Sequence, residues 1–384
     1  MPDRVPPLAE VHAAAGAQFT DFAGWQMPLR YGSELAEHRA VREAAGLFDL
    51  SHMGEIVLVG EEAGAALDHA VSGRMSALEP GRAKYTLMLD EAGGVVDDLI
   101  VYRTGGDRFL VVANAANAEV VAEELRRRAS AFDTRVFDES ADVALIAVQG
   151  PRALEIVLAA EGFAISGGHP DGHDVPEVLG ALGYYRSVAG FFRERALLIA
   201  RTGYTGEDGF ELFCAPDHAR ELWEALVEAG APFGLVPAGL AARDTLRLEA
   251  GMPLYGHELS AERLPATAGL ARAVDLGKPG DFVGKDASAA GPADGAQVLV
   301  GLAGEGRRAA RAGYELFASA AADAAGIGAV TSGALSPTLG RPIAMAYVDP
   351  AFRAPGSTVF VDVRGTRHPY TVTALPFYSR KRTS

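Results

Sequence analysis

A glycine-rich turn between two predicted strands sets the strongest limit on how this chain folds. Its glycines recur at every third position, as Gly203, Gly206 and Gly209. The apolar runs on either side, residues 196–200 and 210–213, are typical of strands. Glycine costs conformational entropy and adds no packing surface, so such a turn needs a reason. It either closes a hairpin or brings backbone amides and carboxylates close to a polar ligand, and the spacing alone favours the hairpin.

Composition narrows the class of protein. The length of 384 residues predicts two or three domains, and 49% hydrophobic with 22% charged residues is typical of globular proteins. A net charge of -15 argues against nucleic-acid binding, which needs a basic surface. No stretch is apolar enough to span a bilayer. The single cysteine, Cys214, excludes an internal disulfide, and residues 1–16 lack a signal-peptide pattern, so we expect a cytoplasmic protein.

The order of predicted elements indicates an α+β protein with a second, all-β part. Strand and helix patterns alternate over residues 56–148, which predicts a mixed α+β layer. Residues 286–295 are the best linker candidate. Beyond them, six short strand patterns with glycine turns predict a small β-barrel or jelly-roll-like domain. Residues 18–31 combine aromatic residues with Gly24 and Pro28, which predicts a packed loop.

The predicted strand over residues 95–102 carries aspartates on both of its faces. Strand alternation places Asp98 and Tyr102 on one face and Asp97 on the other, each aspartate among apolar neighbours. Both faces cannot be ordinary solvated surface. One of the two carboxylates therefore faces a cavity or a hydrogen-bonding partner.

A predicted helix over residues 238–250 places two arginines four positions apart. Arg243 and Arg247 fall on the same side of this helix. Two neighbouring guanidinium groups repel each other unless acids face them. They pair locally with Asp244 or Glu249, or they bind a ligand carboxylate bidentately, and the sequence leaves both possibilities open.

The histidines give no clear metal site. His169 and His173 are four apart but lie in a glycine-rich loop without a helical pattern or an obvious third ligand. We therefore expect no metal. His52, alone in a turn between strand patterns, is interpreted as a structural group whose hydrogen bonds are satisfied.

Several polar residues together fit a flat heterocycle with an anionic tail. The chain has no dinucleotide-binding fingerprint, no phosphate-binding loop and no nucleophile elbow. What remains is a set of carboxylates and phenols, together with the arginines of the predicted helix. Carboxylates facing aromatic rings suit a heterocycle with a guanidine-like edge, and arginines suit a carboxylate tail. Folate has both ends.

Motifs along almost the whole chain carry a family resemblance. The segments include DFAGWQMPLRY, FDLSHMGE, GGVVDDLIVYR, VVANAAN, RTGYTGEDGFEL, PAGLAARDTLRLEAGMPLYG and LPFYSRKR. Taken in order, from near residue 21 to near residue 382, they resemble the aminomethyltransferases of the glycine cleavage system, the T-proteins. The motifs are highly specific when they occur together.

The resemblance implies a fold and domain limits. It implies an α+β protein built as a three-domain cloverleaf around a central folate channel, with a ferredoxin-like mixed layer and a C-terminal β-barrel. Residues 1–285 would form the folate-binding region from two interwoven α+β domains. Residues 296–378 would form the barrel.

The resemblance also implies site residues. The second aspartate of the DDLIVY strand, Asp98, matches the residue most closely tied to catalysis. At the C-terminal end the expected contact is Arg382, with Tyr378 and Arg380 as alternatives. The substrate-binding residues that the resemblance implies are Tyr85, Tyr102, Asn117, Tyr204, Glu211, Arg243 and Arg382.

The implied reaction transfers a one-carbon unit. Its donor is an aminomethyl group on the lipoyl arm of the H-protein, and its acceptor substrate is tetrahydrofolate. The products are ammonia and 5,10-methylenetetrahydrofolate, with no metal, nucleic acid or membrane involved. The alternatives are a folate-dependent demethylase and a folate-binding protein of iron–sulfur cluster repair, whose KGC-type cysteine motif this chain lacks.

Overall fold

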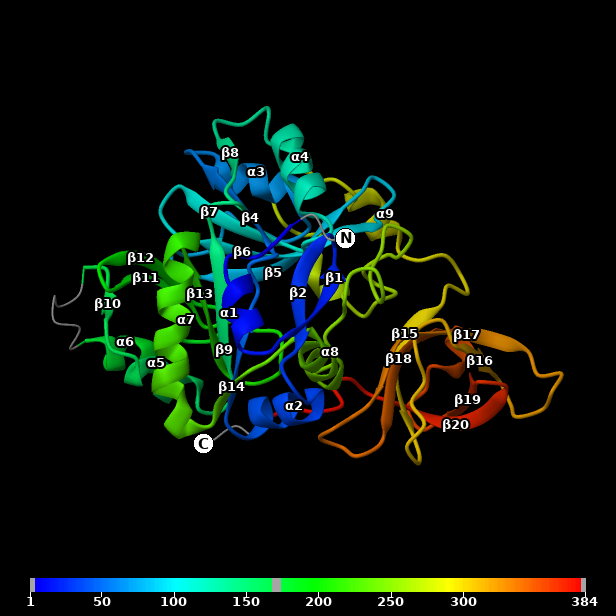
Figure 1. Cartoon of the computed structure of the whole chain (residues 1–384). Coiled ribbons are helices and arrows are strands. Elements are labelled where there is room, and N and C mark those ends of the chain that lie inside the picture. Colours follow the sequence, from blue (N-terminus) through cyan, green and yellow to red (C-terminus); the bar gives the residue numbers. More distant parts are fainter. Residues whose placement is uncertain (1–3, 168–173, 381–384) are drawn as a thin grey trace. The chain divides into compact units, whose positions relative to one another are not determined.

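The computed structural model describes residues 4–167 and 174–380, which fall into two compact units (Figure 1). The first unit comprises Met1–Thr86 and Leu99–Arg243, and the second Leu87–Asp98 and Asp244–Ser384. Strand β6 (Val95–Arg103) and helix α8 (Leu240–Glu249) each run from one unit into the other. The domain limits expected from the sequence, 1–285 and 296–378, stay a prediction.

A seven-stranded sheet is the centre of the first unit. It is antiparallel except for the parallel pair at one edge, β14 with β3. Its strands, in spatial order, are β10 (Phe163–Ile165), β11 (Ser187–Phe192), β12 (Arg195–Ala200), β13 (Gly209–Cys214), β9 (Ala144–Gln149), β3 (Ala45–Asp49) and β14 (Leu235–Pro237). The glycine-rich stretch therefore joins two antiparallel neighbours, β12 and β13, so the hairpin reading is confirmed.

Helices cover one face of this sheet and form the main core with it. Apolar side chains of β9 and β13 pack there against the helices drawn in green in Figure 1. The helices of this part of the chain are α1 (Ala9–Ala14), α2 (Glu34–Glu43), α5 (Ala153–Ala159), α6 (Val175–Ala181), α7 (Pro216–Gly230) and the short η1 (Ala231–Phe233). Helix α2 begins after Ser33, whose hydroxyl accepts a hydrogen bond from the amide of Ala36 and caps the helix.

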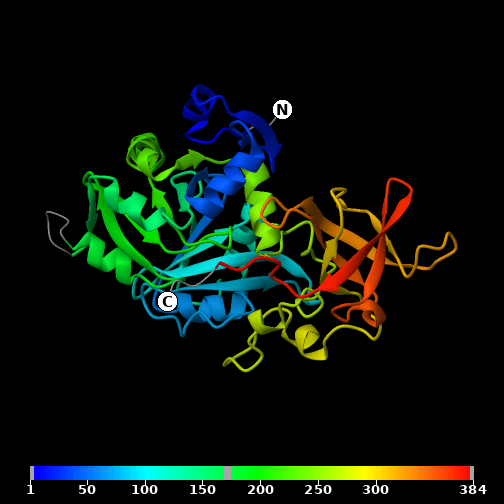
Figure 2. The same cartoon turned by 90° about the horizontal axis from the view of Figure 1, so that it is seen from below.

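A five-stranded antiparallel sheet carries the predicted aspartates. Figure 2 shows its cyan strands with α3 (Ala63–Ala70) lying along one face, where α4 (Ala118–Arg128) also packs. Its strands, in order, are β5 (Ala83–Leu89), β6, β7 (Arg108–Ala113), β4 (Gly54–Val59) and β8 (Arg135–Asp138). Burial alternates along β6, so that Asp97 is fully buried and Asp98 half-buried. The two faces of this strand thus differ as predicted.

The packed loop predicted over residues 18–31 is wrong. This segment is a β-hairpin of β1 (Gln18–Phe22) and β2 (Trp25–Arg30). The two residues between the strands, Ala23 and Gly24, both have positive φ, at 52° and 80°. Such a two-residue turn matches the twist of paired strands, and it explains why a glycine interrupts the aromatic pattern.

The C-terminal strands close into a barrel, which confirms the predicted β-barrel. In spatial order the strands are β15 (Val298–Gly304), β18 (Pro342–Val348), β17 (Gly326–Leu335), β16 (Glu315–Phe317), β19 (Thr358–Val363) and β20 (Thr366–Thr373). Ahead of them, α9 (Lys285–Ala290) occupies part of the predicted linker, which is therefore not all linker. Two short 3-10 helices complete this part, η2 (Ala271–Ala273) and η3 (Pro350–Phe352).

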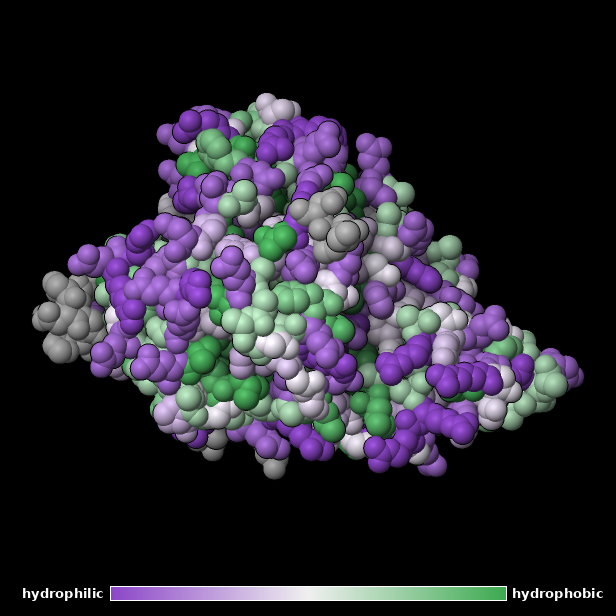
Figure 3. Space-filling model, in the orientation of Figure 1, coloured by the Kyte–Doolittle hydropathy of each residue, from purple (hydrophilic) through white to green (hydrophobic). Residues whose placement is uncertain are grey.

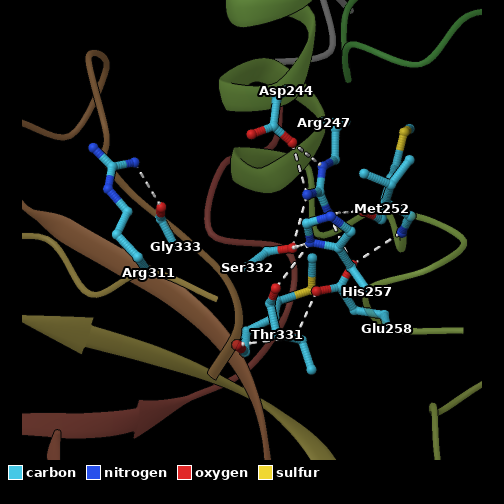
Figure 4. Close-up of polar contacts among 11 residues, drawn as sticks. Asp244, Arg247, Met252, His257, Glu258, Arg311, Thr331, Ser332 and Gly333 are labelled. Carbon is cyan, nitrogen blue, oxygen red and sulfur yellow. Dashed lines mark hydrogen bonds and ion pairs between the residues drawn. The ribbon is translucent and has the colours of Figure 1, made fainter. Parts of the chain in front are cut away.

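Arg247 fastens α8 to the barrel. It is 1% exposed, and its guanidinium group makes hydrogen bonds and ion pairs within the second unit (Figure 4). Nε donates to Asp244 Oδ1 at 2.8 Å, and Nη2 lies 2.7 Å from the same oxygen in an ion pair. Nη2 donates to Ser332 Oγ at 2.8 Å. Nη1 donates to Glu258 Oε2 at 2.9 Å and to the carbonyl of Met252 at 3.3 Å. Arg247 is thus a structural residue.

A bulge in β17 brings the barrel to this cluster. The register with β18 shifts between Val330 and Ser332, so that Thr331 is the extra residue. Its hydroxyl donates to Glu258 Oε1 at 2.5 Å, and its carbonyl lies 2.9 Å from Nδ1 of His257. The bulge therefore turns a barrel strand toward the ion pair of α8.

The surface has no large apolar band on the face shown in Figure 3, where hydrophobic residues occur in separate small groups. Exposed large apolar side chains, such as Val5, Val120 and Leu276, come from different elements. In the described part of the chain, no helix has the length and apolar character needed to cross a membrane.

We predict that Arg247→Met lowers the free energy of unfolding by about 3–5 kcal/mol, because the fully buried Glu258 loses its charged partner. Urea unfolding measures the loss. Arg311→Met is the matched control, since this exposed arginine makes one hydrogen bond, to the carbonyl of Gly333, and its loss should cost about 0.5 kcal/mol or less. Equal losses in the two variants would contradict the structural role.

Candidate active site

The face of the seven-stranded sheet opposite the core carries the candidate site. Phe48, Ala147 and Glu211 are paired in register on β3, β9 and β13, so their side chains share this face. The alternate residues, such as Ile146 and Leu212, point into the helix-covered core. The same strands thus serve the core on one side and leave the other side for a site.

A pocket opens on this face of the first unit. Its cavity volume is about 10 Å³, roughly the space of one water molecule, so the lining side chains rather than the size of the cavity define the candidate site. Its walls come from the sheet, the β12–β13 loop and the first turn of α8. The lining residues are Phe48, Leu50, Ala147, Gln149, Tyr204, Thr205, Glu211 and Arg243.

Glu211 is the buried carboxylate of the pocket. It is 8% exposed, and its Oε2 accepts hydrogen bonds from Thr202 Oγ1 at 2.5 Å and from the hydroxyl of Tyr102 at 3.2 Å. Burial raises its pKa, and these two hydrogen bonds and the charge of Arg243 oppose the rise. A ligand that donates hydrogen bonds or carries positive charge would therefore be favoured beside it.

Tyr204 and Arg243 form a cation–π pair on another wall. The guanidinium carbon of Arg243 lies 4.6 Å from the centroid of the Tyr204 ring, within the range of a cation–π interaction. The N–H groups of a guanidinium at this wall suit an anionic or carbonyl group of a ligand.

The other two acids of the glycine loop are structural. Glu207 accepts from Arg42 Nη1 at 2.9 Å, and the same nitrogen donates to the carbonyl of Thr205 at 2.7 Å. Asp208 is held bidentately by Arg201, at 2.9 and 2.6 Å. Of the acids at this loop, Glu211 is therefore the one that lines the pocket.

Comparison with known proteins identifies this architecture. Residues 8–278 match the GCVT N-terminal domain, and residues 297–379 match the glycine cleavage T-protein C-terminal barrel domain. The chain is 54% identical to the aminomethyltransferase of Cutibacterium acnes over 374 residues, which is 97% of this chain and 98% of that protein. The chain belongs to the glycine cleavage T-protein family.

Two further T-protein relatives agree over nearly the full length. The aminomethyltransferase of Saccharopolyspora erythraea is 54% identical over 378 residues, covering 98% of both chains. The crystal structure of the glycine cleavage system aminomethyltransferase T from Bartonella henselae superposes with a TM-score of 0.86 at 36% identity, covering 98% of this chain and 99% of that one. The expected α+β fold with a C-terminal β-barrel is confirmed.

The residues predicted from the T-protein motifs fall in different places. Tyr204, Glu211 and Arg243 line the pocket together, and Tyr102 lies behind it, fully buried against Glu211. Arg247, the second arginine of α8, instead forms ion pairs with Asp244 and Glu258. Asp244 is one of the two local partners that the sequence suggested.

The remaining predicted residues do not line this pocket. Tyr85 is half-buried on β5, and Asn117 stands at the N-cap of α4. Asp98 belongs to the part of β6 in the second unit. Arg382, like His169 and His173, lies outside the described residues. All of these site assignments stay predictions.

The interpretation of His52 as a satisfied structural group is wrong in one respect. The ring is 1% exposed and meets Phe22 edge-on at 5.3 Å, yet neither ring nitrogen has a hydrogen-bond partner among the described residues. Burial, reinforced by the charge of Arg243, lowers the pKa of His52 to about 3. The ring is therefore neutral.

Three residues of the site escaped the sequence argument. Gln149, Thr202 and Thr205 are buried around the glycine loop and hydrogen-bond to it or to Glu211. A glutamine directly after an apolar strand pattern was the available signal for Gln149, but it has no distinctive spacing. Within residues 4–167 and 174–380, no group of three or more His, Cys, Asp or Glu side chains is arranged to hold a metal ion.

We predict that Glu211→Gln stabilises this protein more at pH 8 than at pH 5. Folding raises the pKa of Glu211 above its ordinary value of 4.5, so its stabilising contribution is present at low pH and lost as the pH rises through the folded pKa. Glutamine cannot ionise and avoids this loss. Urea unfolding at both pH values measures the difference.

The exposed Glu155→Gln serves as the control for this comparison, because Glu155 sits at the surface in a pair with Arg152. Its effect should change little between pH 5 and pH 8. A Glu211→Gln effect that is equally independent of pH would contradict the proposed cost of burying the carboxylate.

Proposed function

We propose that this chain transfers the methylene of an aminomethyl group, carried on the lipoyl arm of the H-protein, to tetrahydrofolate. The reaction releases ammonia and forms 5,10-methylenetetrahydrofolate in glycine cleavage. The observation that carries this proposal is the match, over 97–98% of the chain, to relatives named aminomethyltransferase. The pocket supports it, because a ring with N–H donors suits the buried Glu211.

The bond changes define what the site must do. The folate N5 attacks the methylene carbon, the bond from that carbon to the amine breaks, and the proton lost from N5 reaches the amine, which leaves as ammonia. N10 then closes the ring while the carbon–sulfur bond breaks and the dihydrolipoyl thiol departs. Positive charge develops on the folate nitrogens during the attack, so a nearby carboxylate lowers the barrier.

Asp98 is the residue to which we assign this task. It is half-buried on β6. Burial raises the pKa of the neighbouring Tyr255, and the charges of Asp97, Glu262, Asp98 and Asp90 raise it further. A carboxylate in such an acidic, partly shielded environment favours a cation next to it. Asp98 would accept a hydrogen bond or a proton from a folate nitrogen.

The pocket residues divide folate binding between them. Glu211 would accept hydrogen bonds from the pterin edge, and the ring of Tyr204 would lie beside the pterin plane. Arg243 is fixed over that ring and would meet an anionic or carbonyl oxygen of the substrate. These contacts supply binding, and the chemical step is assigned to Asp98.

The partner and compartment follow from the same proposal. Membership of the glycine cleavage T-protein family implies that this chain acts in the glycine cleavage system. We propose the lipoylated H-protein as its direct partner and the cytoplasm as its location. The folate-binding protein of cluster repair is disfavoured, because Cys214 is 4% exposed and burial raises its pKa to about 12.

We predict that Asp98→Asn slows turnover about a hundred- to ten-thousandfold while folate still binds, because the amide cannot accept a proton. The measurement is formation of 5,10-methylenetetrahydrofolate from aminomethylated H-protein, with folate affinity determined separately. Asp97→Asn is the matched control, since it makes the same change on the opposite face of β6, and turnover per folded molecule should stay close to wild type.

Two outcomes would contradict parts of this proposal. Normal turnover of Asp98→Asn would remove Asp98 from the chemistry and leave the overall function intact. A wild-type protein that binds folate but never turns over with the aminomethylated donor would refute aminomethyl transfer. The folate-dependent demethylase and the folate-binding protein would then become the leading functions.

A further inference from the structure

The side chain of Gln149 holds the glycine loop at both ends of Tyr204. Gln149 is the last residue of β9, is 2% exposed and lines the pocket. Its Nε2 donates to the carbonyl of Thr202 at 3.0 Å, and its Oε1 accepts from Thr205 Oγ1 at 2.9 Å. One amide thus ties down the residues on either side of Gly203 and Tyr204.

Two of the three loop glycines leave room for this side chain. A Cβ at Gly203 would lie 1.9 Å from Gln149 Oε1, and a Cβ at Gly209 would lie 2.3 Å from its Nε2. Both distances are far below any real carbon contact. Gly206 differs, because its φ of +81° is a backbone conformation that residues with side chains rarely adopt. The Gln149 amide therefore occupies space that a Cβ at Gly203 or Gly209 would fill.

The contact reaches Glu211 through Thr202. Gln149 fixes the carbonyl of Thr202, and the hydroxyl of the same threonine donates to Glu211 Oε2 at 2.5 Å. The hydroxyl of Tyr102 lies 2.8 Å from that Thr202 hydroxyl. A shift of Thr202 would thus loosen the carboxylate that we assign to the pterin.

The geometry requires a side chain that donates and accepts at once. The Thr202 carbonyl can only accept, so it needs a donor on Gln149. The Thr205 hydroxyl donates to Gln149 Oε1 at 2.9 Å and accepts from the amide of Glu207 at 3.2 Å. A carboxylate in place of the amide would face a carbonyl without a proton. A thioether of similar length would make neither bond.

We propose that Gln149 is a positioning residue that sets folate affinity by holding Glu211 and Tyr204 in one arrangement. This inference rests on the proposed function. Gln149 acts through Thr202 and Thr205, so its loss weakens binding of tetrahydrofolate and leaves the chemical step largely intact.

The test compares Gln149→Met with wild type for calorimetric affinity for tetrahydrofolate and for KM and kcat. We expect affinity to fall about tenfold and KM to rise by the same factor, as for the loss of one or two hydrogen bonds, with kcat changed by less than about threefold. Gln149→Glu should weaken binding further. Thr205→Val removes the bond to Oε1 at nearly constant shape and should give a smaller loss, about threefold.

The pH dependence of folate affinity separates positioning from a general loss of structure. The hydrogen bond from Thr202 lowers the pKa of Glu211 against the effect of burial. When Gln149→Met lets Thr202 move, the pKa of Glu211 rises, and the acid limb of the affinity profile shifts to higher pH. Partial unfolding would reduce the number of binding sites without moving this limb.

Gln297→Met is the matched control. Gln297 donates from Nε2 to Asp349 Oδ1 at 3.1 Å, and neither residue lines the pocket, so the same change there should leave folate affinity unaltered. The proposal is overturned if folded Gln149→Met and Thr205→Val bind folate as wild type does, with an unshifted acid limb. Calorimetry measures folate binding without the aminomethylated H-protein. Failure of aminomethyl transfer in the wild type would therefore be distinguished from failure of this proposal.

Discussion

The candidate site of the first unit depends on how the protein stabilises the buried Glu211 carboxylate. A carboxylate at 8% exposure loses most of its hydration, and the protein compensates with two hydroxyl donors, Thr202 and Tyr102, and with the charge of Arg243. The same side chain lines the pocket. A site of this kind has an unmet preference for a hydrogen-bond donor, and that preference is what a ligand with ring N–H groups would satisfy.

The sheet provides the rigid frame that such a site needs. Phe48, Ala147 and Glu211 stand in one row across three hydrogen-bonded strands, and the core helices pack on the opposite face. The ladder therefore fixes the carboxylate's backbone independently of any ligand. The loop is held just as firmly, by Gln149 from the sheet and by Arg42 from α2. Pre-organisation of this kind lowers the entropy that binding must overcome.

The two arginines of helix α8 have different roles because different residues surround them. Arg243 stacks on Tyr204 and lines the pocket, whereas Arg247, one turn later, is fully enclosed by Asp244, Glu258 and the barrel. A guanidinium that is 1% exposed and paired with two carboxylates has a structural role rather than a ligand-binding one. Its ion pairs instead fix the helix against the bulged strand β17, so one helix carries a binding residue and a structural clamp.

The sequence by itself determined the strands of the barrel, the hairpin around the glycine loop and the family, because alternation, glycine turns and motif order are local properties. It also singled out Glu211 and Arg243 through the motifs. It could not choose between a ligand and Asp244 as partner for each arginine, nor reveal that Gln149 fills the space left by Gly203 and Gly209. Those depend on side chains from strands distant in the chain, and only the tertiary structure brings them within hydrogen-bonding distance.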